Sequence, residues 1–223
     1  HLGLAGIIDI ASANRVRAAL LMGDVSVSDD RTTSAAGALG GRFGSVVAIG
    51  TGSFVARSTA SGTQFAGGWG FSLGDQASGA WLGQQLLTTV LLMRDGVVPE
   101  SALGRTVLAD FGDNPAEMLW FSKTATPADY ARYAPAVVQA ASGGDVTATK
   151  LMQEGARYIE GALGAVGHKP HDPLCLIGGV GPYYVPYLNE DIAGKLTEPR
   201  GSALDGALRL AVAGYRAKRA AGT

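Results

Sequence analysis

The stretch that decides the fold is SVVAIGTGSFVARSTASGTQFAGGWGFSLGD, residues 45–75. Its runs 45–49, 54–57 and 63–66 are rich in β-branched and aromatic residues, and glycine-containing turns separate them. Short runs of this composition between glycine turns are typical of consecutive strands joined as hairpins. The sequence therefore predicts a small antiparallel ladder over these residues. A further strand is predicted at residues 174–177.

The end of this stretch opens a second segment, GGWGFSLGDQASGAWLG, residues 67–83, which holds six glycines and two tryptophans. Glycine lets backbone approach a ligand closely, tryptophan offers a flat apolar face, and Asp75 offers two hydrogen-bond acceptors. That combination suits a sugar, but tryptophans beside glycines can also be core residues. For Trp81, which lies in a helical pattern, we favour the core; for Trp69 we favour a ligand contact.

Helical patterns lie on both sides of the ladder. Apolar residues recur at helical spacing over residues 81–93, and helices continue to about residue 164. Asn114-Pro115 and Thr126-Pro127 each predict the start of a helix. The remaining pattern predicts helices at 12–22, 33–39 and 201–219, a strand at 25–28, and a helix that opens at Pro182. Strands, glycine turns and helices in alternation favour an α/β fold.

Composition excludes several classes of protein. The 223 residues are 47% hydrophobic and 17% charged, which is typical of a folded globular chain. The formal net charge is −1 and no Lys/Arg-rich run occurs, so we expect no nucleic-acid partner. The sequence shows no secretory signal and no apolar run that would span a bilayer, so we expect no membrane partner. The single cysteine, Cys175, fits a buried strand in a reducing compartment, and we expect a cytoplasmic protein.

Two glycine turns are candidate nucleotide sites. GTGS, residues 50–53, and GGVG, residues 178–181, each follow a predicted strand. Exposed backbone N–H groups in such turns can hold phosphate oxygens, although a plain hairpin turn is the simpler interpretation of the first. The second is not a dinucleotide fingerprint, because Tyr184 stands where the third glycine would be required. It remains a turn on which a flat base can lie.

The acidic pair Asp29-Asp30 follows the predicted strand 25–28. An acid at that place can be a general base or can cap the following helix. His168 and His171 flank a proline in a predicted loop, and we expect no metal site there, because further ligands are lacking.

Along the chain, five motifs in order resemble the N-acetylglucosamine/glucosamine kinase branch of the BadF/BadG/BcrA/BcrD ATPase family. They are the acidic pair, the glycine turn 50–53, the Gly-Trp-Gly to Gly-Asp segment, the glycine turn 178–181 and Gly-Ser-Ala-Leu-Asp-Gly-Ala-Leu at residues 201–208. The resemblance covers nearly the whole chain, and the Gly-Trp-Gly to Gly-Asp segment is its most specific part. It implies the actin-like, ribonuclease-H-like ATPase fold of the actin–hexokinase–Hsp70 superfamily, with two lobes and a central mixed sheet flanked by helices. It also implies ATP and Mg2+ as cofactors, and transfer of the γ-phosphate to the 6-hydroxyl of an amino sugar.

The resemblance assigns roles to individual residues. It implies that Asp30 deprotonates the 6-hydroxyl, since the spacing to residues 36–38 selects it over Asp29. It places residues 141–145 near the adenine and implies no metal ligand among the residues present. The implied sugar-binding residues are Ser53, Gly68, Trp69, Gly70 and Asp75; the implied ATP-binding residues are Gly50, Thr51 and Gly52 in the second phosphate loop, and Gly178, Gly179 and Gly181 in the adenosine turn.

The sequence departs from the family pattern at its start. The Asp-Gly-Gly-Gly-Thr-type first phosphate loop, with the acid that organises Mg2+, is absent. We therefore expect an incomplete first lobe, residues 1–42 with 203–223, and a second lobe, 43–202, with a helical insert at about 77–166. Apolar helices of that insert leave room for a homodimer face.

Two further interpretations stay open. The chain can be a sugar-binding regulatory relative without catalysis, or an activator-type ATPase of the same family. The single Cys175 argues against the activators, which bind an iron–sulfur cluster with more than one cysteine. Gln76 and Phe54 replace residues common in the family, so the sequence does not fix which amino sugar is used.

Overall fold

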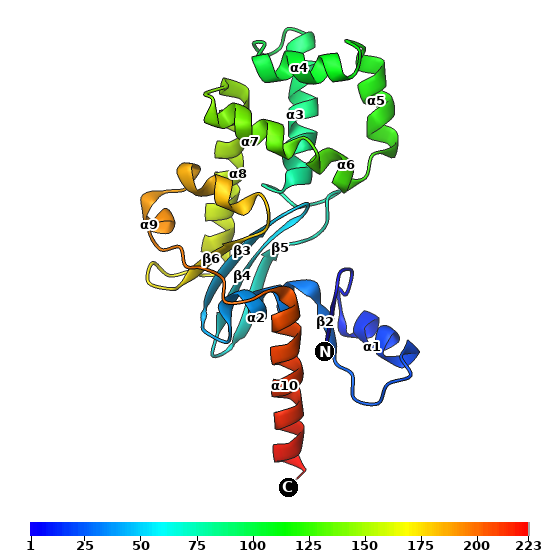
Figure 1. Cartoon of the computed structure of the whole chain (residues 1–223), viewed down its shortest axis with the longest axis vertical. Helices are drawn as coiled ribbons and strands as arrows, with labels where there is room; N and C mark the ends of the chain where they lie inside the picture. The colour runs from blue at the N-terminus through cyan, green and yellow to red at the C-terminus, as the bar shows by residue number, and fades with distance from the viewer. Residues whose placement is uncertain (223) are drawn as a thin grey trace.

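A four-stranded mixed sheet forms the centre of the computed structural model, which describes residues 1–222 (Figure 1). Its strand order is β5-β4-β3-β6. β3 pairs antiparallel with β4, β4 pairs antiparallel with β5, and β3 pairs parallel with β6. The bounds are Gly44–Ile49 for β3, Ser53–Thr59 for β4, Gly62–Gly67 for β5 and Leu174–Ile177 for β6. The predicted hairpin ladder and fourth strand are therefore confirmed to within two residues.

Both faces of the sheet are covered. Successive side chains of a strand point to opposite faces, so neighbouring residues of β3 are buried in two different cores. Val47 of β3 is buried in the larger core, with α3 (Gly79–Arg94) and α8 (Val146–Ala165). Its neighbour Val46 is buried in the smaller core, with α2 (Asp30–Leu39) and Cys175. The predicted core position of Cys175 is thus confirmed.

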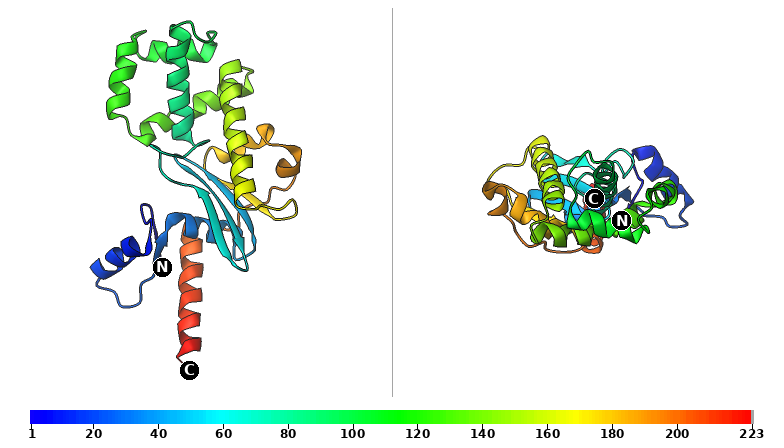
Figure 2. Two further views of the ribbon diagram at one scale, coloured as in Figure 1. Left: turned by 180° about the vertical axis from the view of Figure 1, so that it is seen from behind. Right: turned by 90° about the horizontal axis from the view of Figure 1, so that it is seen from above.

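The segment between β5 and β6 is helical and stands at one end of the molecule (Figures 1 and 2). Asn114 and Thr126 cap two of its helices with their side chains, and each helix has proline in its first turn, as predicted. Between α3 and α8 lie α4 (Ala102–Asp110), α5 (Pro115–Thr124), α6 (Pro127–Ala131) and α7 (Ala134–Ser142).

The start of the chain forms a separate two-stranded parallel sheet, β1 (Leu2–Leu4) with β2 (Val27–Asp29). The helix α1 (Ile10–Ala19) joins them and starts two residues before the predicted helix, because Asp9 and Ser12 form a capping box. The last helix, α10 (Ala203–Ala221), crosses α2 closely and extends away from the rest of the molecule (Figure 2).

The helix predicted at Pro182 is a 3-10 helix, η1 (Gly181–Tyr187), and it is followed by the short α9 (Glu190–Ala193). Pro186 lies inside η1 and has no N–H to donate, so an α-helical bond cannot form there. Within residues 1–222, no helix is long and apolar enough to cross a membrane.

Candidate active site

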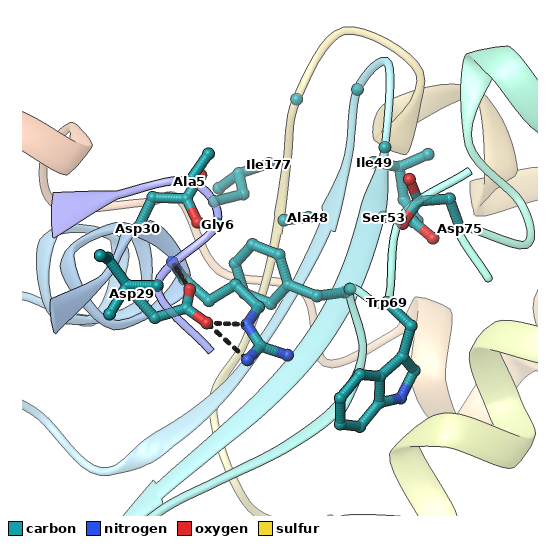
Figure 3. Close-up of a pocket in the computed structure, with 18 of the residues that line it drawn as sticks. Ala5, Gly6, Asp29, Asp30, Ala48, Ile49, Ser53, Trp69, Asp75 and Ile177 are labelled. Atoms are coloured by element: carbon teal, nitrogen blue, oxygen red, sulfur yellow. Dashed lines mark hydrogen bonds and ion pairs between the residues drawn. The ribbon is translucent and has the colours of Figure 1, made fainter. Parts of the chain in front are cut away.

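A cavity of about 640 Å³ opens between the β1–β2 segment and the end of the central sheet (Figure 3). Asp29 and Asp30 lie on one side of it, and Ser53 and Asp75 lie on the other. It brings together most of the residues implied by the resemblance, although they come from segments far apart in the sequence. Its lining includes the implied residues Asp30, Gly50, Gly52, Ser53, Gly68, Trp69, Gly70, Asp75 and Gly178.

The two adjacent acids have different surroundings. Asp29 caps α2: its carboxylate accepts the backbone N–H of Arg31 at 2.7 Å and the Nε–H of the same residue at 2.7 Å. Asp30 occupies the first turn of α2 and lines the cavity. Burial and the neighbouring Asp29 carboxylate raise the pKa of Asp30. Asp29 therefore takes the capping role, and Asp30 is the acid left to face a ligand.

Asp75 is only 8% exposed and lies against the turn between β3 and β4. Burial raises its pKa, and this outweighs the opposing effect of backbone hydrogen bonds from Ser53 and Gly70. A Cβ at Gly52 would approach the Asp75 carboxylate to 2.8 Å, so glycine is needed there. The Ser53 hydroxyl donates to the Gln76 carbonyl at 2.6 Å and can only accept from a ligand.

Trp69 stands at the rim of the cavity, and its side chain is 72% exposed. It is therefore not a core residue, whereas Trp81 is partly buried against the larger core, as predicted. The Arg31 guanidinium lies 6.0 Å from the centre of the Trp69 ring and donates to the Gly67 carbonyl at 2.8 Å. Arg31 was not predicted from the sequence: it joins α2 to the glycine-tryptophan segment across the cavity.

A second cavity, of about 730 Å³, lies on the other side of the Gly50–Gly52 turn. Gly50 lines both cavities, so they meet at this turn. The second cavity carries no charged side chain among its described lining, and α7 contributes five of the twelve residues of its predominantly apolar wall. Its lining is Gly50, Thr51, Gly79, Ala131, Ala134, Pro135, Val138, Gln139, Ser142, Gly179, Val180 and Tyr183.

The two glycine turns predicted as nucleotide sites are neighbours in space. Val180 donates its N–H to the Ile49 carbonyl at 3.0 Å, directly before the first turn. A Cβ at Gly178, whose φ is +89°, would lie 2.3 Å from the same oxygen, so only glycine fits this approach. Gly179 lines the second cavity, whereas Gly181 lines neither and instead begins η1.

The residues present fit a nucleotide in the second cavity. Within residues 1–222, the backbone N–H groups of Thr51, which lines this cavity, and of Gly52, which lines the first cavity, donate to no protein acceptor and are free to bind phosphate oxygens. Of the segment 141–145, which we expected near the adenine, Ser142 lines the cavity, whereas Asp145 caps α8.

The histidine loop lies apart from both cavities. The described residues contain no group of three or more His, Cys, Asp and Glu side chains placed to hold a metal ion. His168 bonds through Nδ1 to the buried Ser45 hydroxyl at 2.9 Å and lines neither cavity.

The comparisons identify the class of this fold as an ATPase-type domain of the actin-like class. The chain belongs to the BadF/BadG/BcrA/BcrD ATPase family, whose model matches residues 2–208. The family predicted from the sequence is confirmed.

Among individual proteins, the chain is 31% identical to a glucosamine kinase of Vibrio cholerae over 187 residues, 84% of this chain and 64% of that protein. It thus spans less than two thirds of the length of that relative.

The structure is similar to that of a Chromobacterium violaceum protein assigned as an N-acetylglucosamine kinase, with a TM-score of 0.86 and 34% identity. That match covers 94% of this chain and 74% of the other. A Porphyromonas gingivalis protein with the same assignment matches with a TM-score of 0.63 and 23% identity, over 82% of this chain and 65% of the other. At 23% identity, the match to the Porphyromonas gingivalis protein shows only that the two proteins share a fold. The predicted α/β, actin-like ATPase fold is confirmed.

Proposed function

We propose that the protein is an ATP-dependent kinase that transfers the γ-phosphate to the 6-hydroxyl of an amino sugar, N-acetylglucosamine or glucosamine. The observation that carries the proposal is that two cavities of different character meet at Gly50. The relatives support it, since they are a glucosamine kinase and a protein assigned as an N-acetylglucosamine kinase. Because the chain spans 64% of the length of the first relative, the activity of the whole protein is itself part of the proposal.

Charge decides which ligand occupies which cavity. The first cavity is lined by Asp29, Asp30 and Asp75, and its only cation in the described lining, Arg31, is paired with Asp29. A triphosphate would be repelled there, whereas a neutral or cationic sugar with several hydroxyl donors would not. The second cavity is uncharged and apolar, with free N–H groups at its edge, and this suits a nucleotide.

Phosphoryl transfer needs mainly positioning and charge stabilisation. In the proposed arrangement the phosphates approach Thr51 and Gly52, and the sugar lies between Asp30 and Asp75. Asp30 then accepts the proton of the 6-hydroxyl, while Asp75 and the Ser53 hydroxyl accept hydrogen bonds from the ring hydroxyls. Mg2+ held with the ATP would supply neutralisation of the phosphate charge, since such ions are bound largely by the phosphates themselves, with one or two carboxylates.

The lobe boundaries also belong to the proposal. The lining of the first cavity comes from residues within 1–42 and within 43–202, and this supports a first lobe of residues 1–42 with 203–223 and a second lobe of residues 43–202. Closure of one lobe on the other would shield the sugar from water during transfer.

The test is an ADP-release assay on the full-length natural protein with ATP and Mg2+. N-acetylglucosamine, glucosamine, glucose and no sugar are compared. We expect ADP release that depends on an amino sugar. No ADP release together with a sugar-dependent rise in melting temperature would contradict the kinase and favour a regulatory sugar-binding protein.

Asp30→Asn tests the assigned base. We expect turnover to fall roughly 10²–10⁴-fold while sugar binding persists, because a general base contributes about that factor. Asp110→Asn, an exposed carboxylate at the end of α4, is the matched control. Unchanged turnover in Asp30→Asn would remove that residue from the base role.

A further inference from the structure

The loop that carries Asp75 has an unusual backbone. Asp75 has φ +60° and Ala77 has φ +67°, and neither is glycine. Side chains disfavour this region, and such residues persist only where surrounding contacts hold them. Ala77 is also fully buried, so its backbone cannot be satisfied by solvent. The position of the Asp75 carboxylate therefore depends on whatever holds residues 75–78 in place.

Besides the backbone hydrogen bonds that the Asp75 carboxylate accepts from Ser53 and Gly70, the three consecutive carbonyls of this loop, those of Asp75, Gln76 and Ala77, each accept a hydrogen bond. The Ser53 hydroxyl donates to the Gln76 carbonyl at 2.6 Å, and the Ser78 N–H donates to the Asp75 carbonyl at 3.1 Å. The third comes from outside the loop and its neighbouring strand: the Tyr184 hydroxyl donates to the Ala77 carbonyl at 2.8 Å. Tyr184 therefore fixes the strained residue itself.

The Tyr184 side chain is itself fixed by the residues packed around it. Its side chain is fully buried, and burial raises the pKa of its hydroxyl, so it remains a donor. A Cβ at Gly155 of α8 would lie 2.3 Å from the Tyr184 oxygen, so this glycine makes room for the hydroxyl. The bond to Ala77 thus joins two packed elements.

Those two elements face different cavities. Tyr184 belongs to η1, and the adjacent Tyr183 lines the second cavity together with Val180. The loop begins at Asp75, which lines the first cavity. One hydrogen bond consequently links the wall proposed for the nucleotide to the acid proposed for the sugar.

We propose that Tyr184 is a positioning residue that couples nucleotide binding to sugar binding by holding the Asp75–Ser78 loop. The inference rests on the proposed function, with the nucleotide in the second cavity and the sugar in the first. A nucleotide that packs on Val180 and Tyr183 fixes η1, and through Ala77 it fixes the Asp75 carboxylate. By linkage, bound sugar must raise nucleotide affinity by the same factor.

The experiment uses Tyr184→Phe, which keeps the ring and removes the hydroxyl. The dissociation constant of the preferred amino sugar is measured by calorimetry on the whole protein, with and without a saturating non-hydrolysable ATP analogue. The ratio of the two constants is the coupling factor. Tyr187→Phe is the control, because it removes from the same η1 a partly buried hydroxyl with no protein partner in the described structure.

We expect a coupling factor of about fivefold or more in the wild type and in Tyr187→Phe, in the usual range for coupled sites. In Tyr184→Phe the factor falls to within about twofold of one, and sugar alone binds several-fold more weakly. If that variant folds poorly, Ala77→Gly is added, since glycine adopts a φ of +67° without strain. The added change should restore folding without restoring the coupling.

Two outcomes would overturn the inference and are distinguishable. Amino-sugar binding in the wild type with an equal coupling factor in Tyr184→Phe, even with a lower melting temperature, shows a purely structural tyrosine. A wild type that binds neither amino sugar overturns the proposed function itself, and the coupling with it.

Discussion

The close crossing of α10 over α2 leads to a sharp prediction for Gly206→Ala. A Cβ at Gly206 would lie 1.9 Å from the Thr33 carbonyl oxygen, and a Cβ at Gly37 would lie 1.9 Å from the Ser202 carbonyl oxygen. Non-bonded heavy atoms rest at roughly 3.5 Å, so alanine at position 206 requires α10 to move away by about 1.5 Å. The obstacle is backbone, which cannot rotate aside as a side chain can.

The magnitude follows from two opposing effects. Alanine in place of glycine in a helix gains about 1 kcal/mol of helix propensity, and overpacking a tight contact costs roughly 1–3 kcal/mol. Gly214 lies on the same helix with nothing within 4 Å of its Cβ position, so Gly214→Ala gains propensity without the clash. The difference in unfolding free energy between the two variants therefore isolates the contact, at about 1–3 kcal/mol.

The assay is thermal melting of both variants beside the wild type. A difference of about 2 kcal/mol corresponds to roughly 4–8 °C in a chain of this size. We expect Gly214→Ala to melt at or above the wild type and Gly206→Ala to melt lower. Faster amide exchange along α10 should accompany the lower melting temperature. Equal stabilisation by the two substitutions would refute the close packing of α10 on α2.

Two other predictions follow from individual side chains. Trp69→Ala should weaken amino-sugar binding several-fold but change the unfolding free energy by less than about 0.5 kcal/mol, because the side chain is 72% exposed; a large drop in melting temperature with unchanged binding would contradict this. Burial lowers the pKa of His168 in the folded protein below the ordinary 6.5, so the unfolded chain binds more protons below pH 6.5. The melting temperature should therefore fall as the pH drops from 6.5 toward the lowered pKa, and His168→Gln should show a flatter dependence; parallel pH profiles would exclude the histidine as the cause.

The sheet was predictable from sequence because its signals are local. Glycine turns and β-branched runs lie within a few residues of one another, and the strand bounds agree closely. The 3-10 form of η1 was missed, although Pro182 and Pro186 carry the signal: with Pro186 lacking an N–H, a regular α-helix cannot pass that point.

The candidate site was predictable only in part. Asp30 and Asp75 were predicted from their motifs. Arg31 was not predicted, because no local sequence pattern indicates that its guanidinium reaches the Gly67 carbonyl. The same is true of Val138 and Gln139, which reach the second cavity from α7. These contacts depend on how a helical segment folds back over a sheet, and periodicity along the chain does not encode that placement.

The way the polar groups are used explains why this site suits a hydroxylated ligand. The Ser53 hydroxyl is committed as a donor to Gln76, and the Arg31 guanidinium is committed to Asp29 and Gly67. The side-chain groups left over toward the first cavity are therefore mainly acceptors, the carboxylates of Asp30 and Asp75. An acceptor-lined cavity needs a ligand that donates several hydrogen bonds in fixed directions, and a pyranose with an amino or acetamido group does so. A phosphate or carboxylate brings only further acceptors, so the same arrangement would hold the proposed sugar and would keep the proposed nucleotide on the other side of Gly50.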